Sequence, residues 1–290
     1  MNQLFKTLLS IVVIFLIFFS CKEKLKEKKF NTKELTEIGS KNEGWSLVWL
    51  DEFDSDTIDS NNWNLQVLKA GQFNDEWQRY TDSNENAFIE NGNLVIKALH
   101  ESDTHGIDQY SSARLNTANK QSWKYGKIEA RIKLPKGKGI WPAFWMLGGN
   151  IDENGGDTPW PQCGEIDILE LYGTKHDAVV EANLHYADQS NSHAMMGAKS
   201  YKLDKGIFAD DFHIFALEWD DKNIKWLVDG YQYAITSISE AERSEFHKDF
   251  FILLNLAVGG TYAGRPDTST PFPQLMYVDW VKVYQNNQSS

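Results

Sequence analysis

Apolar and polar residues alternate along much of the chain after about residue 43. The clearest case is the segment 125–135, YGKIEARIKLP, in which an apolar residue follows a charged one four times between Lys127 and Leu134. Side chains on a strand point to opposite faces in turn. The pattern therefore predicts a strand with one buried face and one solvent-facing face.

Several other segments carry strand and turn signals. Residues 212–235 read as strand, turn, strand, Asp-Gly turn and strand, and Asn91-Gly92 predicts a hairpin turn before another strand. The nearly continuous apolar run 250–260, FFILLNLAVGG, predicts a central strand, and 276–285 predicts a further one. Only 237–246, SISEAERSEF, looks helical. Many short strands without a long helix predict an all-β sandwich or barrel.

The N-terminal region differs in composition from the rest. An apolar run from Leu8 to Phe19, interrupted only by Ser10, is too short for a membrane span and suits a signal peptide. Cys21 closes this region and resembles the lipidated residue of a bacterial lipoprotein. We expect a lipoprotein signal peptide at 1–20, a charged tether at 21–42 and one domain at 43–286, attached to a membrane of the cell envelope, outward of the inner membrane. An ordinary signal peptide or an uncleaved anchor is the alternative.

Composition narrows the partners and the chemistry. The net charge is −12 and the body has no basic cluster, which argues against nucleic acid. Aromatic residues make up 13% of the chain, with 11 Trp, and these either stack on sugar rings or fill the core. Cys163 lies two residues before Glu165 but no Cys–His signature accompanies it. We expect a packed thiol rather than a nucleophile.

Two predicted strands could line a site. In 139–148, GIWPAFWMLG, the side chains of Trp141 and Trp145 share one face, which suits consecutive sugar subsites; burial of both in the core is the alternative. In 179–187, VVEANLHYA, the face opposite the apolar one carries Glu181, Asn183 and His185, which could hydrogen-bond hydroxyl groups. A solvated outer face is the rival interpretation there.

The segment 164–173, GEIDILELYG, lies between these two strands and carries three acids. Strict alternation puts Glu165 and Asp167 on one face and sends Glu170 to the apolar side, where an unpaired carboxylate is costly. A β-bulge at Ile168-Leu169 adds one residue and shifts the parity once. With that bulge, all three acids point the same way.

Three roles could require such a cluster. Calcium loops place their ligands on turns rather than on an Ile/Leu-rich strand. A purely structural cluster of like charges needs neighbouring cations, and none is adjacent in sequence. Retaining glycoside hydrolysis needs a nucleophile and a general acid about 5–5.5 Å apart, and mutual repulsion raises the pKa of at least one carboxyl group. This last role accounts best for the residues.

GEIDILE matches the E-x-D-x-x-E motif of glycoside hydrolase family 16, in the branch with a bulged catalytic strand. The resemblance extends over nearly all of 45–286, through segments such as WLDEFD, YGKIEARIKLPKGKGIWPAFWMLG and LLNLAVGGTYAGRPD, and is strongest to the laminarinases, which are endo-β-1,3-glucanases. It implies a β-jelly-roll sandwich of two antiparallel sheets with a concave substrate groove. It also implies Glu165 as nucleophile, Glu170 as general acid/base and Asp167 as their electrostatic helper.

The same resemblance implies the binding residues. Those matching positions in or near the sugar-binding groove are Trp141, Trp145, Trp160, Trp77, Arg79, Asn86 and Arg114, and strand parity adds His185. A structural Ca²⁺ held by oxygens of Glu52, Gly92 and Asp279 is implied on the convex side. We expect no cofactor for catalysis, a β-glucan as the substrate, and a monomer.

Some segments depart from the family pattern. The loop 72–76, QFNDE, replaces the usual Gly-Asn-Asn-Glu, the segment 185–201 after the acids has no close match, and Tyr262 stands where many relatives carry Trp. These loops flank the expected groove, so mixed-linkage β-1,3-1,4-glucan or a galactan such as agarose remains an alternative substrate. A non-catalytic surface glycan-binding protein is a rival from another class, and a purely structural envelope sandwich does not explain the parity break.

Overall fold

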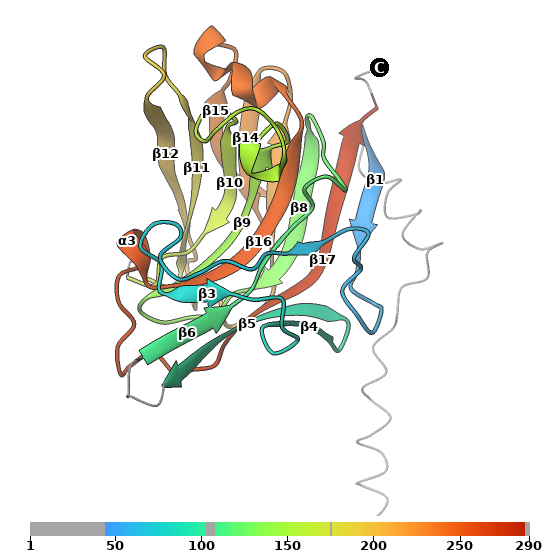
Figure 1. Ribbon diagram of the computed structural model, residues 1–290. Helices are drawn as coiled ribbons and strands as arrows, with labels where there is room; N and C mark the ends of the chain where they lie inside the picture. The colour runs from blue at the N-terminus through green and yellow to red at the C-terminus, as the bar shows by residue number, and fades with distance from the viewer. Residues whose placement is uncertain (1–43, 103–107, 175, 288–290) are drawn as a thin grey trace, which may run out of the picture. The chain divides into compact units, whose positions relative to one another are not determined.

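Two β-sheets pack face to face and enclose a single large apolar core (Figure 1). A computed structural model describes residues 44–102, 108–174 and 176–287. The predicted signal peptide, the tether and Cys21 lie outside the described residues. From Gly44 onward the described residues form one compact unit.

The strands divide between a ten-stranded and a seven-stranded sheet. The ten-stranded sheet has the order β15-β14-β13-β8-β17-β5-β6-β3, with β1 paired to β17 and β4 paired to β5; its strands are β1 (Trp45–Asp51), β3 (Gln78–Tyr80), β4 (Ala87–Glu90), β5 (Asn93–Ser102), β6 (Asp108–Ser112), β8 (Gly126–Lys133), β13 (His213–Trp219), β14 (Asn223–Val228), β15 (Tyr231–Ser237) and β17 (Gln274–Asn286). The seven-stranded sheet has the order β12-β11-β10-β9-β16-β7-β2; its strands are β2 (Asn64–Leu65), β7 (Arg114–Asn116), β9 (Ile140–Gly148), β10 (Glu165–Glu170), β11 (Val179–Ala187), β12 (His193–Lys202) and β16 (Phe250–Val258).

The predicted strand signals appear at their expected places. All nine residues of β16 are buried, as its apolar run requires, because β9 and β7 pair on either side of it. The alternation on β8 buries Ile128, Ala130 and Ile132 in the core. The hairpin turns at Asn91-Gly92 and Asp229-Gly230 have positive φ at both residues, which the type I′ turn requires.

Helical structure is confined to short pieces among the described residues. The segment that looked helical forms the 3₁₀ element η2 (Ala241–His247), and two others are η1 (Asp152–Asn154) and α3 (Gly260–Ala263). No helix in the described part of the chain has the length and apolarity needed to span a membrane.

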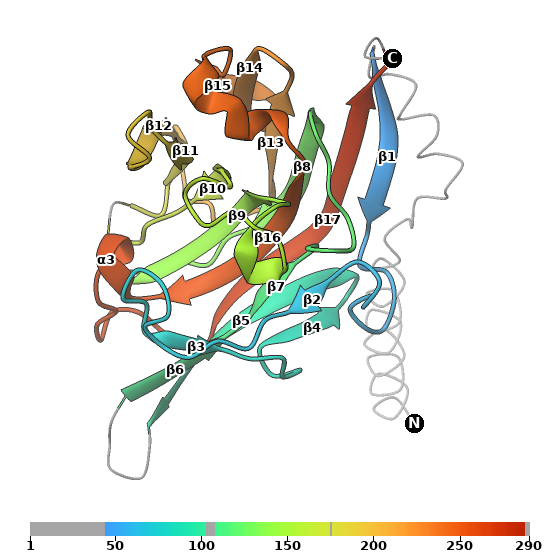
Figure 2. The same cartoon turned by 45° about the horizontal axis from the view of Figure 1, so that its top comes forward.

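The architecture is the expected all-β jelly-roll sandwich, with one local difference. β3 and β6 pair in parallel through Gln78↔Tyr110 and Tyr80↔Ser112, whereas the other strand pairs are antiparallel. Figure 2 shows β9, β10, β11 and β16 side by side in the seven-stranded sheet, which carries the acids.

Candidate active site

A β-bulge in β10 places the three acids on one face. Against β9, Asp167 pairs with Trp145 and Leu169 with Phe144, so Ile168 is the extra residue. Against β11, Asp167 pairs with Asn183 and Glu170 with Glu181, which again leaves one residue over. The bulge predicted from sequence parity is therefore confirmed, and Glu170 escapes the apolar core that receives Ile166 and Leu169.

The bulge is held from the opposite sheet. Trp226 on β14 crosses the core and donates its indole N–H to the backbone oxygen of Asp167 at 2.9 Å. Trp226 is 1% exposed. A bulge leaves part of the backbone ladder unpaired, and a buried carbonyl without a donor is costly. The Trp226 hydrogen bond satisfies that carbonyl and ties the acid-bearing strand to the ten-stranded sheet.

The acids line a cavity of about 460 Å³. Its wall lies on the face of the seven-stranded sheet that points away from the core: Trp145, Asp167 and Asn183 line it, whereas their neighbours Phe144, Ile166 and Leu184 lie in the core. Of the predicted binding residues, the cavity wall includes Trp141, Trp145, Trp160, Arg114 and His185. Both Trp residues of β9 therefore face the cavity rather than the core.

Glu170 is surrounded by neutral hydrogen-bond donors. Its Oε1 accepts the indole N–H of Trp141 at 3.0 Å. Its Oε2 accepts the hydroxyl of Tyr172 and the amide N–H of Asn183, both at 2.7 Å. Glu170 is only 8% exposed, so these donors supply the solvation that water would otherwise provide. They come from three separate segments, and together they fix the orientation of the carboxyl group.

Glu165 lies nearer the open side of the cavity. The indole N–H of Trp160, a residue that is 43% exposed, donates to Glu165 Oε2 at 2.8 Å. The Nε2 atom of His185 lies 3.8 Å from the other carboxyl oxygen. Trp160 therefore presents an exposed ring to the cavity while its N–H orients a carboxyl group.

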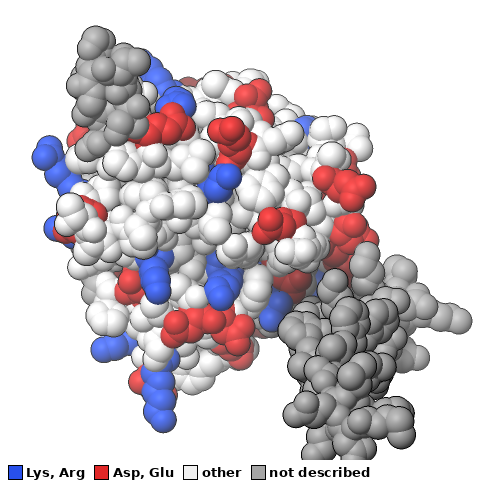
Figure 3. All heavy atoms as spheres, turned by 90° about the horizontal axis from the view of Figure 1, so that it is seen from below, with Lys and Arg blue, Asp and Glu red and all other residues white. Residues whose placement is uncertain are grey.

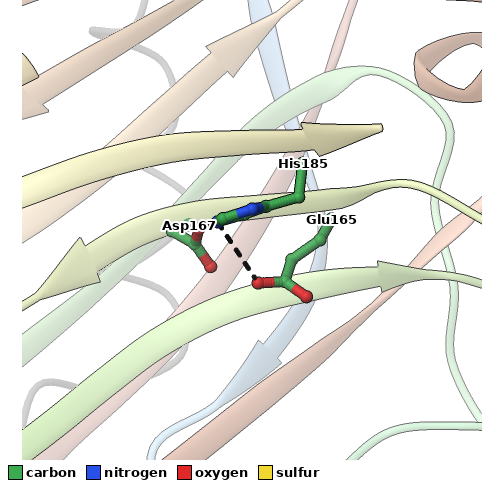
Figure 4. Close-up of side chains that lie close together, drawn as sticks. All are labelled: Glu165, Asp167 and His185. Carbon is green, nitrogen blue, oxygen red and sulfur yellow. Dashed lines mark ion pairs between the residues drawn. The ribbon is translucent and has the colours of Figure 1, made fainter. Parts of the chain in front are cut away.

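Asp167 is the most deeply buried of the three acids, at 2% exposure. Figure 4 shows Asp167, Glu165 and His185 with their polar atoms turned toward one another from the adjacent strands β10 and β11. Asp167 Oδ2 lies 3.3 Å from His185 Nε2 and makes no hydrogen bond. Among the described residues, the ion-pair partner of both Glu165 and Asp167 is His185.

Burial of the like-charged cluster changes its proton affinity. Burial first, and the neighbouring Asp167 charge second, raise the pKa of Glu165 to about 8, although His185 opposes the shift. Burial and the Glu170 charge raise the pKa of Asp167 well above its usual range. Burial also raises the pKa of Glu170, while the donors Tyr172 and Asn183 act in the opposite direction. The cluster therefore binds protons more strongly than exposed carboxyl groups do, as a general acid requires.

A polar network extends the cavity wall on the side of β16 and β7. Trp145 donates its indole N–H to Asn255 Oδ1 at 2.7 Å. The guanidinium of Arg114 lies between two aromatic rings, 4.8 Å from the centroid of Trp145 and 4.9 Å from that of Phe73. Arg114 is 6% exposed and its Nε makes no hydrogen bond. This arrangement leaves a cationic donor in the wall of the cavity.

Three predicted binding residues do not line the cavity. The guanidinium of Arg79 instead bonds Glu101 at 2.9 Å, and the Asn86 amide bonds the Lys97 carbonyl and Ser111 inside the protein. Trp77 packs against the core and beneath the Arg265 guanidinium. The polar groups of Arg79 and Asn86 therefore bond other residues of the protein rather than face the cavity.

Sequence reasoning did not predict the contacts that several residues of the wall make. Tyr172 lies two residues after Glu170, and side chains at that spacing on a strand share a face. This spacing is the sequence feature that indicates a contact between them. Asn183 was expected on the polar face of its strand, but its bond to Glu170 depends on the register between β10 and β11. His193 lies in the segment without a close family match, and its Nε2 is 2.9 Å from His185 Nδ1.

Cys163 is a packed residue with no exposed surface. Burial, together with the charge of Glu165, raises the pKa of its thiol to about 12. Because the thiolate is the reactive species, this environment disfavours nucleophilic chemistry at neutral pH. The expectation of an inert thiol agrees with the structure.

The residues predicted to bind calcium lie away from the acids. Strand register brings them to one region of the ten-stranded sheet. Asp51, which precedes Glu52, pairs with Val281 on β17. Leu94, two residues after Gly92, pairs with Val278, which precedes Asp279. The Asp279 carboxylate already accepts a charged hydrogen bond from Arg131 at 2.7 Å.

Figure 3 shows acidic and basic side chains interspersed over one face of the molecule, without a large region of one sign among the residues drawn there.

Comparison with known proteins gives consistent matches. The profile of Glycosyl hydrolases family 16 matches residues 73–282. A "Glucan endo-1,3-beta-glucosidase A1" of Niallia circulans is 34% identical over 83% of this chain and 38% of its own length, so the chain spans well under half of that relative. A "Beta-glucanase" of Rhodothermus marinus is 37% identical over 83% of this chain and 85% of its own length. The catalytic domain of an endo-1,3-beta-glucanase (laminarinase) from Thermotoga petrophila RKU-1 superposes with a TM-score of 0.73 at 46% identity, covering 84% of this chain and 99% of that one.

Proposed function

The chain belongs to glycosyl hydrolases family 16, and from that premise we propose that it is an endo-acting, retaining β-1,3-glucanase. The observation that carries the proposal is the bulge in β10, which turns three acids into one cavity. Support for the linkage comes from the laminarinase and the β-1,3-glucosidase relatives. The enzyme class needs no cofactor for its chemistry.

The mechanism consists of two displacements at the anomeric carbon. Glu170 gives its proton to the leaving glycosidic oxygen while a carboxylate oxygen of Glu165 bonds to C1 and the C1–O bond breaks. This forms a covalent glycosyl-enzyme. Glu170, now ionised, takes a proton from water, whose oxygen bonds to C1 as Glu165 leaves. Two inversions give a product of retained β configuration.

The cluster supports these roles through its electrostatics. Glu165 must be ionised to attack, and the Trp160 N–H and the His185 ring favour its charged form. Asp167 is buried beside Glu165 and binds a proton readily, so it can donate a hydrogen bond to the nucleophile. The order of roles, with Glu165 as nucleophile and Glu170 as acid/base, follows the family motif.

Sugar-binding roles follow from the cavity wall. We assign Trp141, Trp145 and Trp160 to stacking on glucose rings, and Arg114 and His185 to hydrogen bonds with hydroxyl groups. Trp141 and Trp160 have two roles in this proposal, because each also donates its indole N–H to a catalytic carboxyl group. Sugar stacking and carboxyl orientation are therefore coupled in this cavity.

Hydrolysis of laminarin, lichenan and agarose tests the proposal directly. NMR of the first product formed from laminarin should show the β-anomer, and oligosaccharides should appear before glucose. Products from lichenan or agarose alone would contradict the β-1,3 preference and leave the reaction type intact. Binding of laminarin without any product would favour a glycan-binding protein instead.

Azide rescue distinguishes the two glutamates. Azide should restore turnover of an activated aryl β-glucoside by Glu165→Gly and give an α-glycosyl azide, because azide replaces the nucleophile on the opposite face. In Glu170→Gly, azide should intercept the glycosyl-enzyme and give a β-glycosyl azide. The reverse assignment of products would overturn the roles given to the two residues.

Calcium is part of the proposal as a structural ion. Carboxylate and carbonyl oxygens are suitable donors, and register places Glu52, Gly92 and Asp279 in one region. The charge around Asp279 is less favourable, because Arg131 and Lys282 both approach it. Calcium at 100 times its Kd should raise Tm by about 5–10 °C, and EDTA should reverse the rise. An unchanged Tm would exclude this ion.

Membrane attachment remains a proposal based on residues 1–42. We propose that Cys21 carries lipid, that the tether holds the domain outward of the inner membrane in the cell envelope, and that the domain works as a monomer. Cys21→Ser should move the protein from the membrane fraction to the soluble fraction in a lipoprotein-processing host. Retention of that variant in the membrane would favour an anchor helix. Light scattering of the detergent-solubilised protein tests the monomer.

A further inference from the structure

We propose that Zn²⁺ binds in the cavity through Glu165, Asp167 and His185, and that bound zinc blocks the site. The three side chains offer one nitrogen and two carboxylate oxygens, and these atoms all lie within 4.8 Å of one another. They project from adjacent strands rather than from a mobile loop, as Figure 4 shows. Rigid supporting strands favour a defined metal geometry.

The distances suit shared metal ligands better than direct contacts. His185 Nε2 lies 3.3 Å from Asp167 Oδ2 and 3.8 Å from Glu165 Oε1. Zinc bonds of about 2.0–2.2 Å in a tetrahedral arrangement separate neighbouring ligand atoms by about 3.3–3.6 Å. Small side-chain rotations would bring the three atoms to this spacing. The fourth position would face the open cavity and hold water.

Asp167 supplies an independent indication of a ligand. Its Oδ2 is buried and makes no hydrogen bond, although it is directed at His185. A buried carboxyl oxygen without a hydrogen bond is costly and normally has a partner. A metal ion between Oδ2 and His185 Nε2 would satisfy both atoms at once.

His193 acts as the supporting residue. Its Nε2 lies 2.9 Å from His185 Nδ1, and the two rings stack at 5.1 Å with an interplanar angle of 18°. If Nδ1 of His185 donates this hydrogen bond, Nε2 carries the lone pair that a metal requires. Metal-binding histidines typically donate their second N–H to such an acceptor, and loss of the acceptor weakens binding about 10–100-fold.

The ligand set favours zinc over the hard cations. Magnesium and calcium prefer six or more oxygen ligands, whereas imidazole nitrogen suits zinc and copper. Because zinc would occupy the oxygens proposed to attack the sugar and to assist that attack, it would compete with substrate. The inhibition rests on the proposed function, whereas the binding itself does not.

Calorimetry and crystallography on the full chain test the site. Titration with zinc chloride in detergent should give one site whose Kd rises at least tenfold in His185→Gln and about 10–100-fold in His193→Gln. A zinc-edge anomalous peak should lie about 2.0–2.2 Å from the three ligand atoms. The matched control is His213→Gln, because His213 also pairs with a carboxylate, Asp229 at 2.7 Å, but in the other sheet and with one acid only.

The outcomes separate the two proposals. Zinc should raise the KM for laminarin while leaving kcat unchanged, and calcium chloride should not. No anomalous peak, or a zinc Kd unchanged in both His185→Gln and His193→Gln, would overturn the metal site. A bound zinc ion in a protein that leaves every β-glucan intact would overturn the hydrolase and leave the metal site standing.

Discussion

The outer face of β8 and the cavity face of β10 both carry charged side chains, yet their partners differ. On β8 both signs are present, and Lys127 bonds Glu129 at 2.9 Å while Arg131 bonds Asp279 at 2.7 Å. On β10 all three charged residues are acids, and their closest donors are the neutral N–H and O–H groups of Trp, Tyr and Asn side chains.

The difference shows two ways of placing charge on a sheet. Complementary charges on β8 compensate one another, so that face contributes modestly to stability. The acids of β10 repel one another in a buried place and raise one another's pKa, which lowers stability when they ionise. An active site that needs a general acid requires a carboxyl group with a raised pKa. Neighbouring cations would lower that pKa, so the loss of stability goes with the catalytic role.

The largest expected effect comes from neutralising an acid of the β10 cluster, compared with the same change on β8. Glu165→Gln should lower kcat by roughly 10³–10⁵-fold and leave the fold intact, because the charge it removes is the proposed nucleophile. Glu129→Gln, the matched change on β8, should leave kcat within about twofold and lower the free energy of unfolding by about 1–3 kcal/mol, because Glu129 is buried and its loss leaves Lys127 without its ion-pair partner. Laminarin kinetics and chemical denaturation of both variants check this. Near-normal turnover by Glu165→Gln would contradict the assignment.

Stability should depend on pH through the β10 cluster. The pKa of Glu165 is raised from 4.5 to about 8, so between these values the folded protein binds more protons than the unfolded chain. The stability associated with this group is therefore fully present below about pH 4.5 and is lost as pH rises through about 8. Calorimetry should show this fall in wild type and a smaller fall in Glu165→Gln. Equal slopes in both proteins would contradict the raised pKa.

Removing one neutral hydrogen-bond donor tests whether Glu170 is the general acid. Tyr172→Phe deletes a 2.7 Å hydrogen bond that lowers the pKa of Glu170, so that pKa should rise. Because the proposed acid must be protonated in the first step, the alkaline limb of the kcat/KM profile should move to higher pH. Tyr233→Phe serves as control, since Tyr233 lies outside the cavity wall. A shift of the alkaline limb to lower pH would count against Glu170 as the acid.

The smallest effect is expected at Arg79. This residue resembles a substrate-binding position, but its guanidinium pairs with Glu101 and both side chains are about two-fifths exposed, at 42% and 41%. Arg79→Ala should change the free energy of unfolding by about 0–1 kcal/mol, as exposed ion pairs typically do. Its KM for laminarin should stay within about threefold of wild type. A much larger rise in KM would restore Arg79 to the binding site.

Local alternation determined much of this protein. It placed the strands, directed both Trp residues of β9 to one face, and required a bulge between Asp167 and Glu170. These features depend on the period of two along a strand, which the sequence records directly. The family resemblance added the order of roles among the acids and the sandwich of two sheets.

Tertiary structure alone decided the surroundings of the acids. Asn183 reaches Glu170, His193 reaches His185, and Trp226 reaches the bulge from the other sheet, through strand register and sheet packing between residues far apart in the chain. The same packing kept Asn86 and Arg79 out of the cavity by giving their polar groups internal partners. Alternation fixes the face on which a side chain lies, but its partner is fixed only when distant strands assemble, because hydrogen bonds and burial depend on distances that no local pattern contains.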